Sequence, residues 1–204
     1  ILFVDWYEGF NPSSNFLTSM LHSAHDGIVV TNNIDECDVI IAGCYGSDLL
    51  TLSETIQEKL VMFVSGENLS PSYDIHDFSL TTLPQSFCGK NTRYPQWYGE
   101  LDLKSNNATY KYERNCSKFP PKRDLLITSI YNNATPLREE TIAFLREKFG
   151  SNNVHIFGSQ RCGEVDKFEI LSRSKINLCF ENSIGEGYST EKLLHALSFG
   201  CSAA

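Results

Sequence analysis

Residues 175–200 read KINLCFENSIGEGYSTEKLLHALSFG, and this stretch decides the fold that we expect for the chain. Its apolar residues within 176–180 predict a short buried strand, residues 181–187 a polar loop, and residues 190–199 a helix closed by Gly200. A strand, a loop and a helix in this order form half of a βαβ unit. Ligands of open α/β sheets bind outside the carboxyl ends of the strands. The stretch therefore predicts a ligand site in its loop.

Lys192 is an unusual residue for the first turn of that predicted helix. A cation there opposes the helix dipole, at a cost of up to about 1 kcal/mol unless an anion offsets it. Arg138 falls in the first turn of a second predicted helix, which Thr135 can cap and Pro136 can begin. Position alone favours a surface arginine at 138. Two such helices could instead converge on one diphosphate, and Lys192 indicates a bound phosphate.

The rest of the chain alternates predicted strands and helices, which indicates an α/β protein with a mostly parallel sheet. Strands are predicted at residues 1–4, 28–30, 38–42, 60–64, 78–82, 124–130 and 154–157, and helices at residues 16–24, 47–59, 136–149 and 166–172. Pro120 and Pro121 lead into a fresh strand, so we place a domain boundary between residues 119 and 120. The sequence thus predicts two domains, residues 1–119 and 120–204.

Composition favours a globular protein and argues against several classes. The 204 residues are 41% apolar, and a net charge of −8 argues against a general nucleic-acid or anionic-membrane surface. No apolar run approaches the roughly 18 residues of a membrane span. Seven cysteines without a CxxC pair argue against a zinc site, and Cys44 and Cys179 lie in apolar runs typical of a core. The loop GEGY at 185–188 is not the GxGxxG fingerprint of a dinucleotide site.

Several motifs resemble those of the α-1,3/1,4-fucosyltransferases, the inverting enzymes that use GDP-fucose. FENS at 180–183 followed by GYSTEK at 187–192 is similar to the donor-binding motif of that family. GENLSP at 66–71 and RYPQW at 93–97 are similar to two further family blocks. The resemblance implies a GT-B-type fold, in which two Rossmann-like domains face each other across a cleft. The first domain would hold the acceptor, and the second would hold GDP-fucose.

The resemblance also implies that the family's second domain continues past the end of this sequence. The second domain would then be incomplete, with an unpaired sheet edge and a helix face left uncovered after residue 199. We therefore expect the 204-residue chain alone to bind GDP weakly and to lack measurable transfer.

Glu67 is the candidate catalytic residue. It follows the strand predicted at residues 60–64 and lies beside Gly66, which places a carboxylate at the carboxyl end of a strand. Position alone favours a side chain that faces solvent. The resemblance implies instead that Glu67 is the general base that the family is proposed to use.

The donor site implied by the resemblance surrounds the opening stretch. Arg138 matches an arginine that contacts the donor phosphates, and Lys192 would add a second charge, so that no metal or other cofactor is required, although a divalent metal is compatible. Glu181 is assigned less firmly, because it could only fix the loop through hydrogen bonds. The predicted donor-binding residues are Arg138, Asn182, Tyr188, Glu191, Lys192 and Glu181.

Arg93, Tyr94 and Trp97 are the candidate acceptor-side residues. Aromatic rings interleaved with polar groups can stack on a sugar. Burial beneath the surrounding loop explains the same residues equally well.

The function implied is transfer of L-fucose from GDP-fucose to a hydroxyl of an N-acetylglucosamine- or glucose-containing glycan, with inversion and an α-1,3 or α-1,4 linkage. Two alternatives stay open: a non-catalytic nucleotide-sugar or glycan-binding protein on the same fold, and an α/β transferase that uses another sugar nucleotide. The expected partners are GDP-fucose and an oligosaccharide, without nucleic acid. The expected location is the cytoplasm or a membrane periphery in a bacterium, which the GEN form favours, or the Golgi lumen in a eukaryote.

Overall fold

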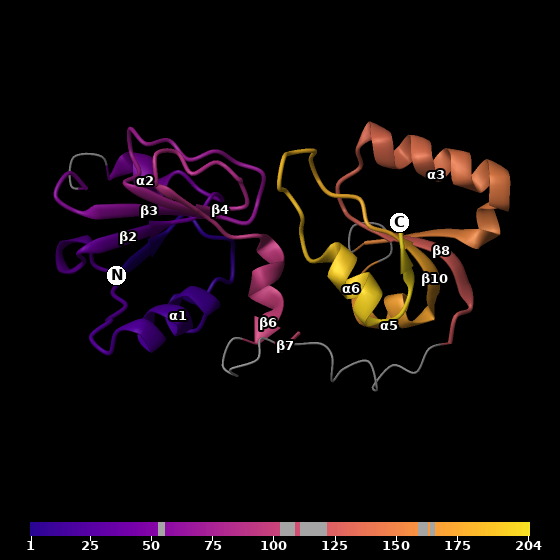
Figure 1. Cartoon of the computed structure of the whole chain (residues 1–204), viewed down its shortest axis with the longest axis horizontal. Coiled ribbons are helices and arrows are strands. Elements are labelled where there is room, and N and C mark those ends of the chain that lie inside the picture. Colours follow the sequence, from indigo (N-terminus) through magenta and orange to yellow (C-terminus); the bar gives the residue numbers. More distant parts are fainter. Residues whose placement is uncertain (53–55, 103–108, 111–121, 159–162, 164–165) are drawn as a thin grey trace. The chain divides into compact units, whose positions relative to one another are not determined.

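The computed structural model describes residues 1–52, 56–102, 109–110, 122–158, 163 and 166–204. It divides into two compact units, one of residues 1–99 and 185–188 and the other of residues 100–184 and 189–204. Each unit holds a parallel sheet with helices, so the predicted α/β class with two Rossmann-like units is confirmed (Figure 1). The predicted boundary between residues 119 and 120 lies in residues 111–121, outside the described residues.

The first unit is built on a five-stranded sheet in which every strand is parallel to its neighbour. Its strands lie in the order of the sequence, β1 (Leu2–Val4), β2 (Val39–Ala42), β3 (Leu60–Ser65), β4 (Phe78–Thr81) and β5 (Asn91–Arg93). Its helical segments are α1 (Phe16–Ala24), α2 (Asp48–Thr51), η1 (Ile34–Glu36) and η2 (Gln96–Glu100). Because the strands run parallel, the loops that follow them all emerge on one side of the sheet, at the carboxyl ends of the strands.

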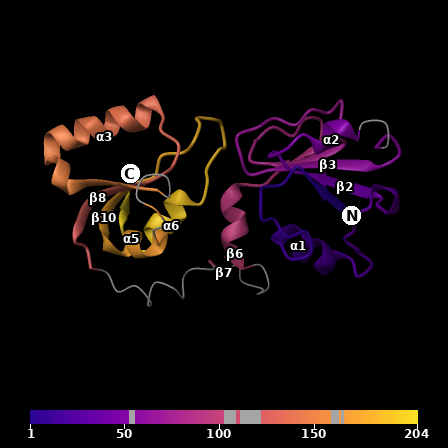
Figure 2. The ribbon, with the colours of Figure 1, turned by 180° about the vertical axis from the view of Figure 1, so that it is seen from behind.

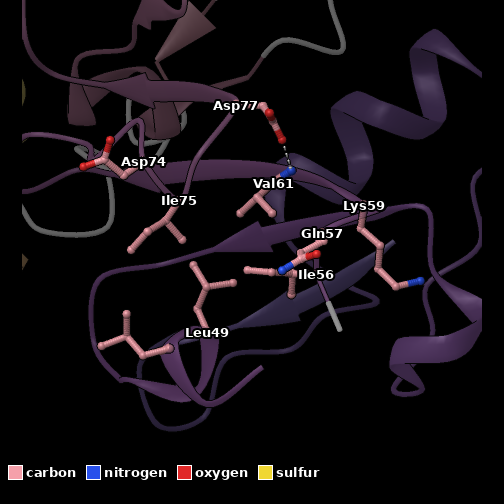
Figure 3. A pocket seen from close by; sticks show the side chains of 9 residues that line it. Leu49, Ile56, Gln57, Lys59, Val61, Asp74, Ile75 and Asp77 are labelled. Carbon is pink, nitrogen blue, oxygen red and sulfur yellow. Dashed lines mark hydrogen bonds between the residues drawn. The ribbon is translucent and has the colours of Figure 1, made fainter. Parts of the chain in front are cut away.

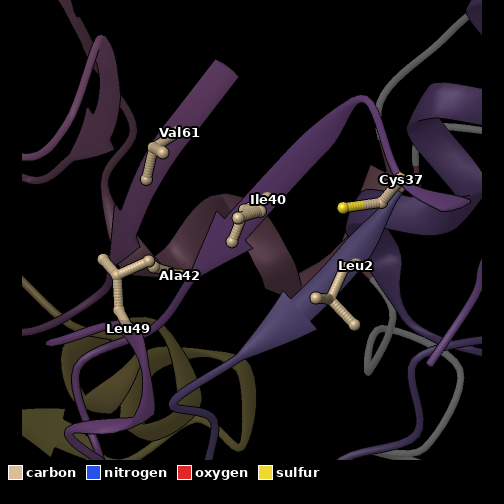
Figure 4. Close-up of a cluster of buried hydrophobic side chains, with 6 residues drawn as sticks. All are labelled: Leu2, Cys37, Ile40, Ala42, Leu49 and Val61. Carbon is tan, nitrogen blue, oxygen red and sulfur yellow. The ribbon is translucent and has the colours of Figure 1, made fainter. Parts of the chain in front are cut away.

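Alternate residues of β2 face two separate cores, as the period of a strand requires. Ile40 and Ala42 pack in a cluster with Leu2, Val61 and Leu49 of α2 (Figure 4). Ile41 points to the other face, where it packs with Leu17 of α1 and with Val64. The helices α1 and α2 therefore cover opposite faces of the sheet, and Figure 1 shows this arrangement.

Three sequence-based predictions differ from the structure of the first unit. Residues 28–30 are not a strand: the amino group of Ile1 donates to the Val29 carbonyl and the Thr31 amide donates to the Ile1 carbonyl, which is too little to form a ladder. The helix predicted at 47–59 is regular only over α2, and residues 53–55 lie outside the described residues. The strand β5 was not predicted, because Asn-Thr-Arg carries no apolar alternation.

A cavity of about 350 Å³ lies against the other edge of this sheet, where β3 and β4 begin (Figure 3). Its lining includes Leu49, Ile56, Val61 and Ile75. Asp77 also lines it and accepts a hydrogen bond from the Val61 amide at 2.9 Å. The cavity therefore lies at the amino ends of the strands, whereas the loop that carries Glu67 lies at their carboxyl ends.

The second unit contains a four-stranded parallel sheet in the order β11 (Ser202–Ala203), β10 (Ser174–Leu178), β8 (Leu125–Ile130) and β9 (Val154–Phe157). Figure 2 shows α3 on one face of this sheet and α5 and α6 on the other. Ile142 of α3 packs with Ile127 and Val154, whereas Leu171 of α5 and Ala196 of α6 form the opposite core. The elements are β8 (Leu125–Ile130), α3 (Pro136–Phe149), η4 (Ser151–Asn153), β9 (Val154–Phe157), α5 (Lys167–Arg173), β10 (Ser174–Leu178), α6 (Lys192–Ser198) and β11 (Ser202–Ala203), with a separate antiparallel pair β6 (Leu101–Asp102) and β7 (Thr109–Tyr110).

Local capping explains why α3 begins at the predicted residue and α5 within one residue of it, whereas α6 begins at Lys192 and not at residue 190. The Thr135 hydroxyl accepts from the Arg138 amide and Pro136 is the first residue of α3, while Asp166 accepts from two amides at the start of α5. The end of the chain differs from the prediction. Ser202 and Ala203 pair with β10, so the edge that we expected to be unpaired after α6 is partly covered.

The five cysteines that the structure describes are free thiols, and both Cys44 and Cys179 are half-buried. Burial raises the pKa of each of these two thiols above its ordinary value. In the described part of the chain, no helix combines the length and the apolar content needed to cross a membrane.

Candidate active site

Glu67 lies in the loop after β3, at the carboxyl edge of the first unit's sheet. Its backbone is fixed locally, because the Ser65 hydroxyl accepts from the Glu67 amide at 3.1 Å and the Leu69 amide donates to the Glu67 carbonyl at 2.8 Å. The side chain is half-buried. The position is therefore that of a defined loop carboxylate, and not of a freely moving surface side chain.

Tyr188 is the partner of this carboxylate. Its ring is buried, with 8% of its surface exposed, and its hydroxyl donates to Glu67 Oε2 at 2.9 Å. In the described part of the chain no group donates to the other oxygen, Oε1. Tyr188 thus holds one oxygen of Glu67 in place and leaves the other unbound. The sequence predicted Tyr188 as a donor-binding residue and gave no indication of this contact.

Two glycines allow residues 185–188 to lie close to the Glu67 loop. A Cβ atom at Gly185 would come within 2.4 Å of the Asn68 side chain. Gly187 has a φ of +76°, and a Cβ atom there would lie 3.1 Å from Pro84 and from the Thr82 carbonyl oxygen. The Gly187 carbonyl accepts from Arg93 Nη2 at 3.3 Å. The GEGY loop is therefore a close-packed segment of the first unit.

The predicted acceptor-side residues have different environments. Tyr94 stacks on Phe16 of α1 with ring centroids 5.1 Å apart and meets Tyr98 edge-on at 5.5 Å. Trp97 also meets Tyr98 edge-on, at 4.5 Å. Arg93 is exposed and bound to Gly187, as described above. The packing explains Tyr94 and Trp97, and a role of these residues in acceptor binding stays a prediction.

Arg138 is a buried residue and not the surface arginine that position alone favoured, because only 1% of it is exposed. Its Nη2 donates to the Phe180 carbonyl at 2.9 Å and to Asn182 Oδ1 at 3.0 Å, and its Nη1 donates to the Asn133 carbonyl. The guanidinium also lies over the Tyr131 ring at 4.9 Å. Arg138 therefore ties the start of α3 to the loop after β10.

The charge of Arg138 is not neutralised by the side chains around it. Across the described ranges no carboxylate forms an ion pair with it, and its Nε is buried without a hydrogen-bond partner. A cation buried without a counter-charge is costly. A bound anion would therefore be stabilised next to this guanidinium.

Glu181 closes the loop between β10 and α6. Its carboxylate accepts from the amide and the hydroxyl of Thr190, both at 2.7 Å, and from Lys192 Nζ at 3.0 Å. The chain thus supplies an anion for Lys192 itself. This pairing removes the need for a phosphate that we inferred from the helix dipole, and contact of Lys192 and Glu181 with the donor stays a prediction.

Glu191 pairs with a lysine that the sequence analysis did not single out. Its Oε1 lies 3.1 Å from Lys167 Nζ, and 18% of the glutamate side chain is exposed. Burial by itself raises the pKa of this carboxyl, but the charges of Lys167 and Lys192 oppose burial and the net pKa is lowered. Glu191 therefore stabilises the unit in its ionised form.

We expect this pairing to make the second unit sensitive to acid. A carboxyl with a lowered pKa contributes stability that is complete above its ordinary pKa and is lost as the pH falls through the lowered value. Urea unfolding from about pH 6 to about pH 3 should show a smaller loss of unfolding free energy in Glu191→Gln than in the unchanged protein. Glu147→Gln is the control, because that carboxylate is 74% exposed. Equal pH dependence in the two variants would contradict the role of Glu191.

Thr190 and Lys167 are two residues of this region that were not predicted as site residues. Thr190 is buried and binds Glu181, and a hydroxyl residue just before a helix was the available indication, because such residues cap helices. Nothing in the sequence pointed to Lys167. Among the described residues, no group of three or more His, Cys, Asp or Glu side chains could hold a metal ion.

The fold and these residues define a two-unit α/β protein with one carboxylate at a sheet edge and a buried arginine near a loop. Residues 1–99 match the family model of the alpha-(1,3)-fucosyltransferase FucT N-terminal domain. A curated relative, the alpha-(1,3)-fucosyltransferase FucT of Helicobacter pylori, is 26% identical over 230 residues, which cover 96% of this chain and 48% of the relative. The first half of the chain is thus similar to the N-terminal domain of the fucosyltransferases, which is the family that the motifs resemble.

Solved structures agree on the fold. A crystal structure of an alpha1,3-fucosyltransferase matches with a TM-score of 0.75 and 22% identity, over 99% of this chain and 66% of that protein. Structures of an alpha1,3-fucosyltransferase with GDP-fucose and with GDP match with TM-scores of 0.72 and 0.73. The chain thus spans about half of the curated relative and 66% of the solved chains.

Proposed function

We propose that the whole protein transfers L-fucose from GDP-fucose to a hydroxyl of an N-acetylglucosamine- or glucose-containing glycan, with inversion at the anomeric carbon. The observation that carries this proposal is Glu67, a half-buried carboxylate with one oxygen bound by Tyr188 and the other open to accept a proton. The curated relative and the solved structures that resemble this chain are themselves named alpha-1,3-fucosyltransferases. A 1,3 or a 1,4 linkage fits the proposal equally well.

An inverting transfer needs a single carboxylate. Glu67 would take the proton from the acceptor hydroxyl while that oxygen bonds to the anomeric carbon of fucose. The bond from this carbon to the β-phosphate oxygen breaks on the opposite face, and GDP leaves with the bonding electron pair. Tyr188 would hold the carboxylate in the orientation required for proton transfer.

The charge that develops on the leaving GDP needs stabilisation, which cations can give without a metal. Arg138 suits this role because it is buried and has no carboxylate partner in the described part of the chain. Lys192 would have to exchange part of its contact with Glu181 for a phosphate oxygen. Asn182 holds Arg138 through Oδ1, so its part in the proposed donor site is to orient the guanidinium.

The choice of nucleotide tests the proposal. Thermal unfolding of the full-length protein should shift upward more with GDP than with ADP or UDP at equal concentration. A ligand at 100 times its Kd adds about 2.7 kcal/mol of stability, which corresponds to a shift of roughly 5–10 °C for a domain of this size. Equal shifts from the three nucleotides would show that phosphate alone is bound, and would favour a transferase with another sugar donor.

A non-catalytic nucleotide-sugar or glycan-binding protein on the same fold is the remaining alternative. A binder needs no proton acceptor, so the dependence of turnover on Glu67 separates the two functions. Release of free fucose or of a fucosylated glycan from GDP-fucose would exclude the binder.

A further inference from the structure

We propose that Tyr7 and Tyr45 form a stacking platform for a pyranose ring of the acceptor glycan. The proposal rests on the function proposed above and names the surface of the first unit that would hold the acceptor. Neither residue belongs to a motif that the sequence analysis assigned to a site.

The two rings form an exposed corner. Tyr7 and Tyr45 are 53% and 56% exposed, and their centroids lie 5.9 Å apart at an interplanar angle of 89°. Phe10 supports Tyr7 from behind, edge-on at 5.6 Å, and itself stacks on Trp6 at 4.3 Å. The exposed rings thus stand on a packed aromatic base, so little conformational entropy is lost when a ligand binds them.

The loops that carry the two rings are fixed to each other by Asp5. Its carboxylate accepts from the amides of Asp48 and Leu49, and its carbonyl accepts from the Tyr45 amide at 2.9 Å. Asp5 adopts a left-handed φ of 58°, which is uncommon for a residue with a side chain. Such a conformation persists only where the surrounding contacts enforce it, and it is frequent at functional sites.

Two glycines make this close approach possible. A Cβ atom at Gly43 would lie 2.4 Å from the Asp5 carbonyl oxygen, and one at Gly46 would lie 2.5 Å from Asp5 Oδ1. Any larger residue at either position would push the loop after β2 away from the loop after β1. The sequence GCYG at 43–46 is therefore built to present Tyr45 beside Tyr7.

The platform lies at the carboxyl ends of the strands, on the same side of the sheet as Glu67. The loops of Tyr7, Tyr45 and Glu67 follow β1, β2 and β3, which are neighbouring parallel strands. A direct link joins the second and third loops, because the Ser65 hydroxyl donates to Cys44 Sγ at 3.5 Å and accepts from the Glu67 amide. An acceptor ring on the platform would thus lie near the proposed base.

The chemistry of the corner suits a sugar. Pyranose rings offer an apolar C–H face that packs on aromatic rings, and hydroxyls at their edge. The phenol hydroxyl of Tyr45 can donate a hydrogen bond to a sugar hydroxyl. Tyr94, by contrast, is already stacked on Phe16. The exposed pair is better placed than Tyr94 to bind a ligand.

Kinetics and sugar binding test the platform in the full-length protein. We expect Tyr7→Ala and Tyr45→Ala each to raise the KM for an N-acetylglucosamine-terminated or glucose-terminated oligosaccharide about tenfold, because each change removes a ring on which the sugar stacks. The KM for GDP-fucose and the hydrolysis of GDP-fucose without acceptor should not change. Tyr7→Phe and Tyr45→Phe should keep most of the affinity, because the rings remain.

Phe78→Ala is the matched control. Phe78 is 51% exposed and begins β4, at the opposite edge of the same sheet. Saturation transfer from protein to N,N′-diacetylchitobiose and to lactose, observed by NMR, gives a readout without turnover. It should fall in both Tyr→Ala variants and stay unchanged in Phe78→Ala.

The outcomes separate this proposal from the function on which it rests. Turnover of GDP-fucose with an unchanged acceptor KM in both Tyr→Ala variants would overturn the platform and leave the transferase standing. If the unchanged protein does not turn over GDP-fucose but saturation transfer is still lost in both Tyr→Ala variants, the platform is supported as a sugar site and the transferase is overturned. Equal loss of sugar binding in Phe78→Ala would overturn the platform as well, because the effect would not be specific to these rings.

Discussion

Replacing Glu67 with glutamine is expected to lower kcat for fucosyl transfer by about two orders of magnitude or more, with little change in the KM for GDP-fucose. Glutamine keeps the shape of the side chain and can still accept the hydrogen bond that Tyr188 donates. It cannot take a proton from the acceptor hydroxyl. Steady-state kinetics with full-length protein, followed by detection of the fucosylated product, measure the change.

Glu58→Gln is the control for this substitution. Glu58 is an exposed carboxylate just before β3, the strand that Glu67 follows, so both changes have the same chemistry at opposite ends of one strand. Tyr188→Phe should lower kcat less than Glu67→Gln, by about tenfold, because the base remains and only its orientation is loosened. Near-normal turnover in Glu67→Gln would show that the base is wrongly assigned and would favour the binding protein.

Replacing Arg138 with alanine is expected to lower the unfolding free energy of the second unit by about 2–4 kcal/mol. The change leaves the carbonyl of the half-buried Phe180 without its donor, which costs roughly 1–3 kcal/mol, and it leaves a cavity where the buried guanidinium packs. Under the proposed function the same variant should also bind GDP more weakly. Urea unfolding gives the first effect, and calorimetric titration of the folded variant with GDP gives the second.

Arg146→Ala is the control on the same helix. Arg146 is exposed and makes one long contact, 3.5 Å from the Val154 carbonyl, so its loss should change stability by about 0.5 kcal/mol or less. Arg138→Lys should recover only part of the lost stability, because an ammonium group cannot reproduce the planar fork of the guanidinium. Arg138→Ala with unchanged stability would contradict its structural role, and unchanged GDP affinity would remove it from the donor site.

The second unit was the easier part to predict, because residues that begin and end helices are visible in its sequence. Thr135 and Pro136 begin α3 and Gly150 ends it, as the structure confirms. Capping depends on residues a few positions apart, which a single sequence displays. The runs at 124–130 and 154–157 are apolar enough to identify β8 and β9 in the same way.

The strand predicted at 28–30 and the strand β5 show where local patterns fail. An apolar triplet becomes a strand only when a neighbouring strand forms a ladder with it, and here Ile1 bonds only to the Val29 carbonyl and to the Thr31 amide. The polar residues of β5 pair with β4, and Asn91 is held by the hydroxyls of Ser79 and Thr81. Pairing across the sheet overrides local propensity in both cases.

The sequence by itself determined the α/β class, the helix boundaries that caps specify, and the candidate residues that lie in recognisable motifs, Glu67 and Arg138 among them. These features depend on side chains close together along the chain, or on the resemblance of short blocks. Only the tertiary structure decided how the candidates are used. It placed Tyr188 on Glu67 across 121 residues, paired Lys192 with Glu181, and buried Arg138. It also brought Tyr7 and Tyr45 together, since such contacts arise from the order of strands in a sheet and not from neighbours in sequence.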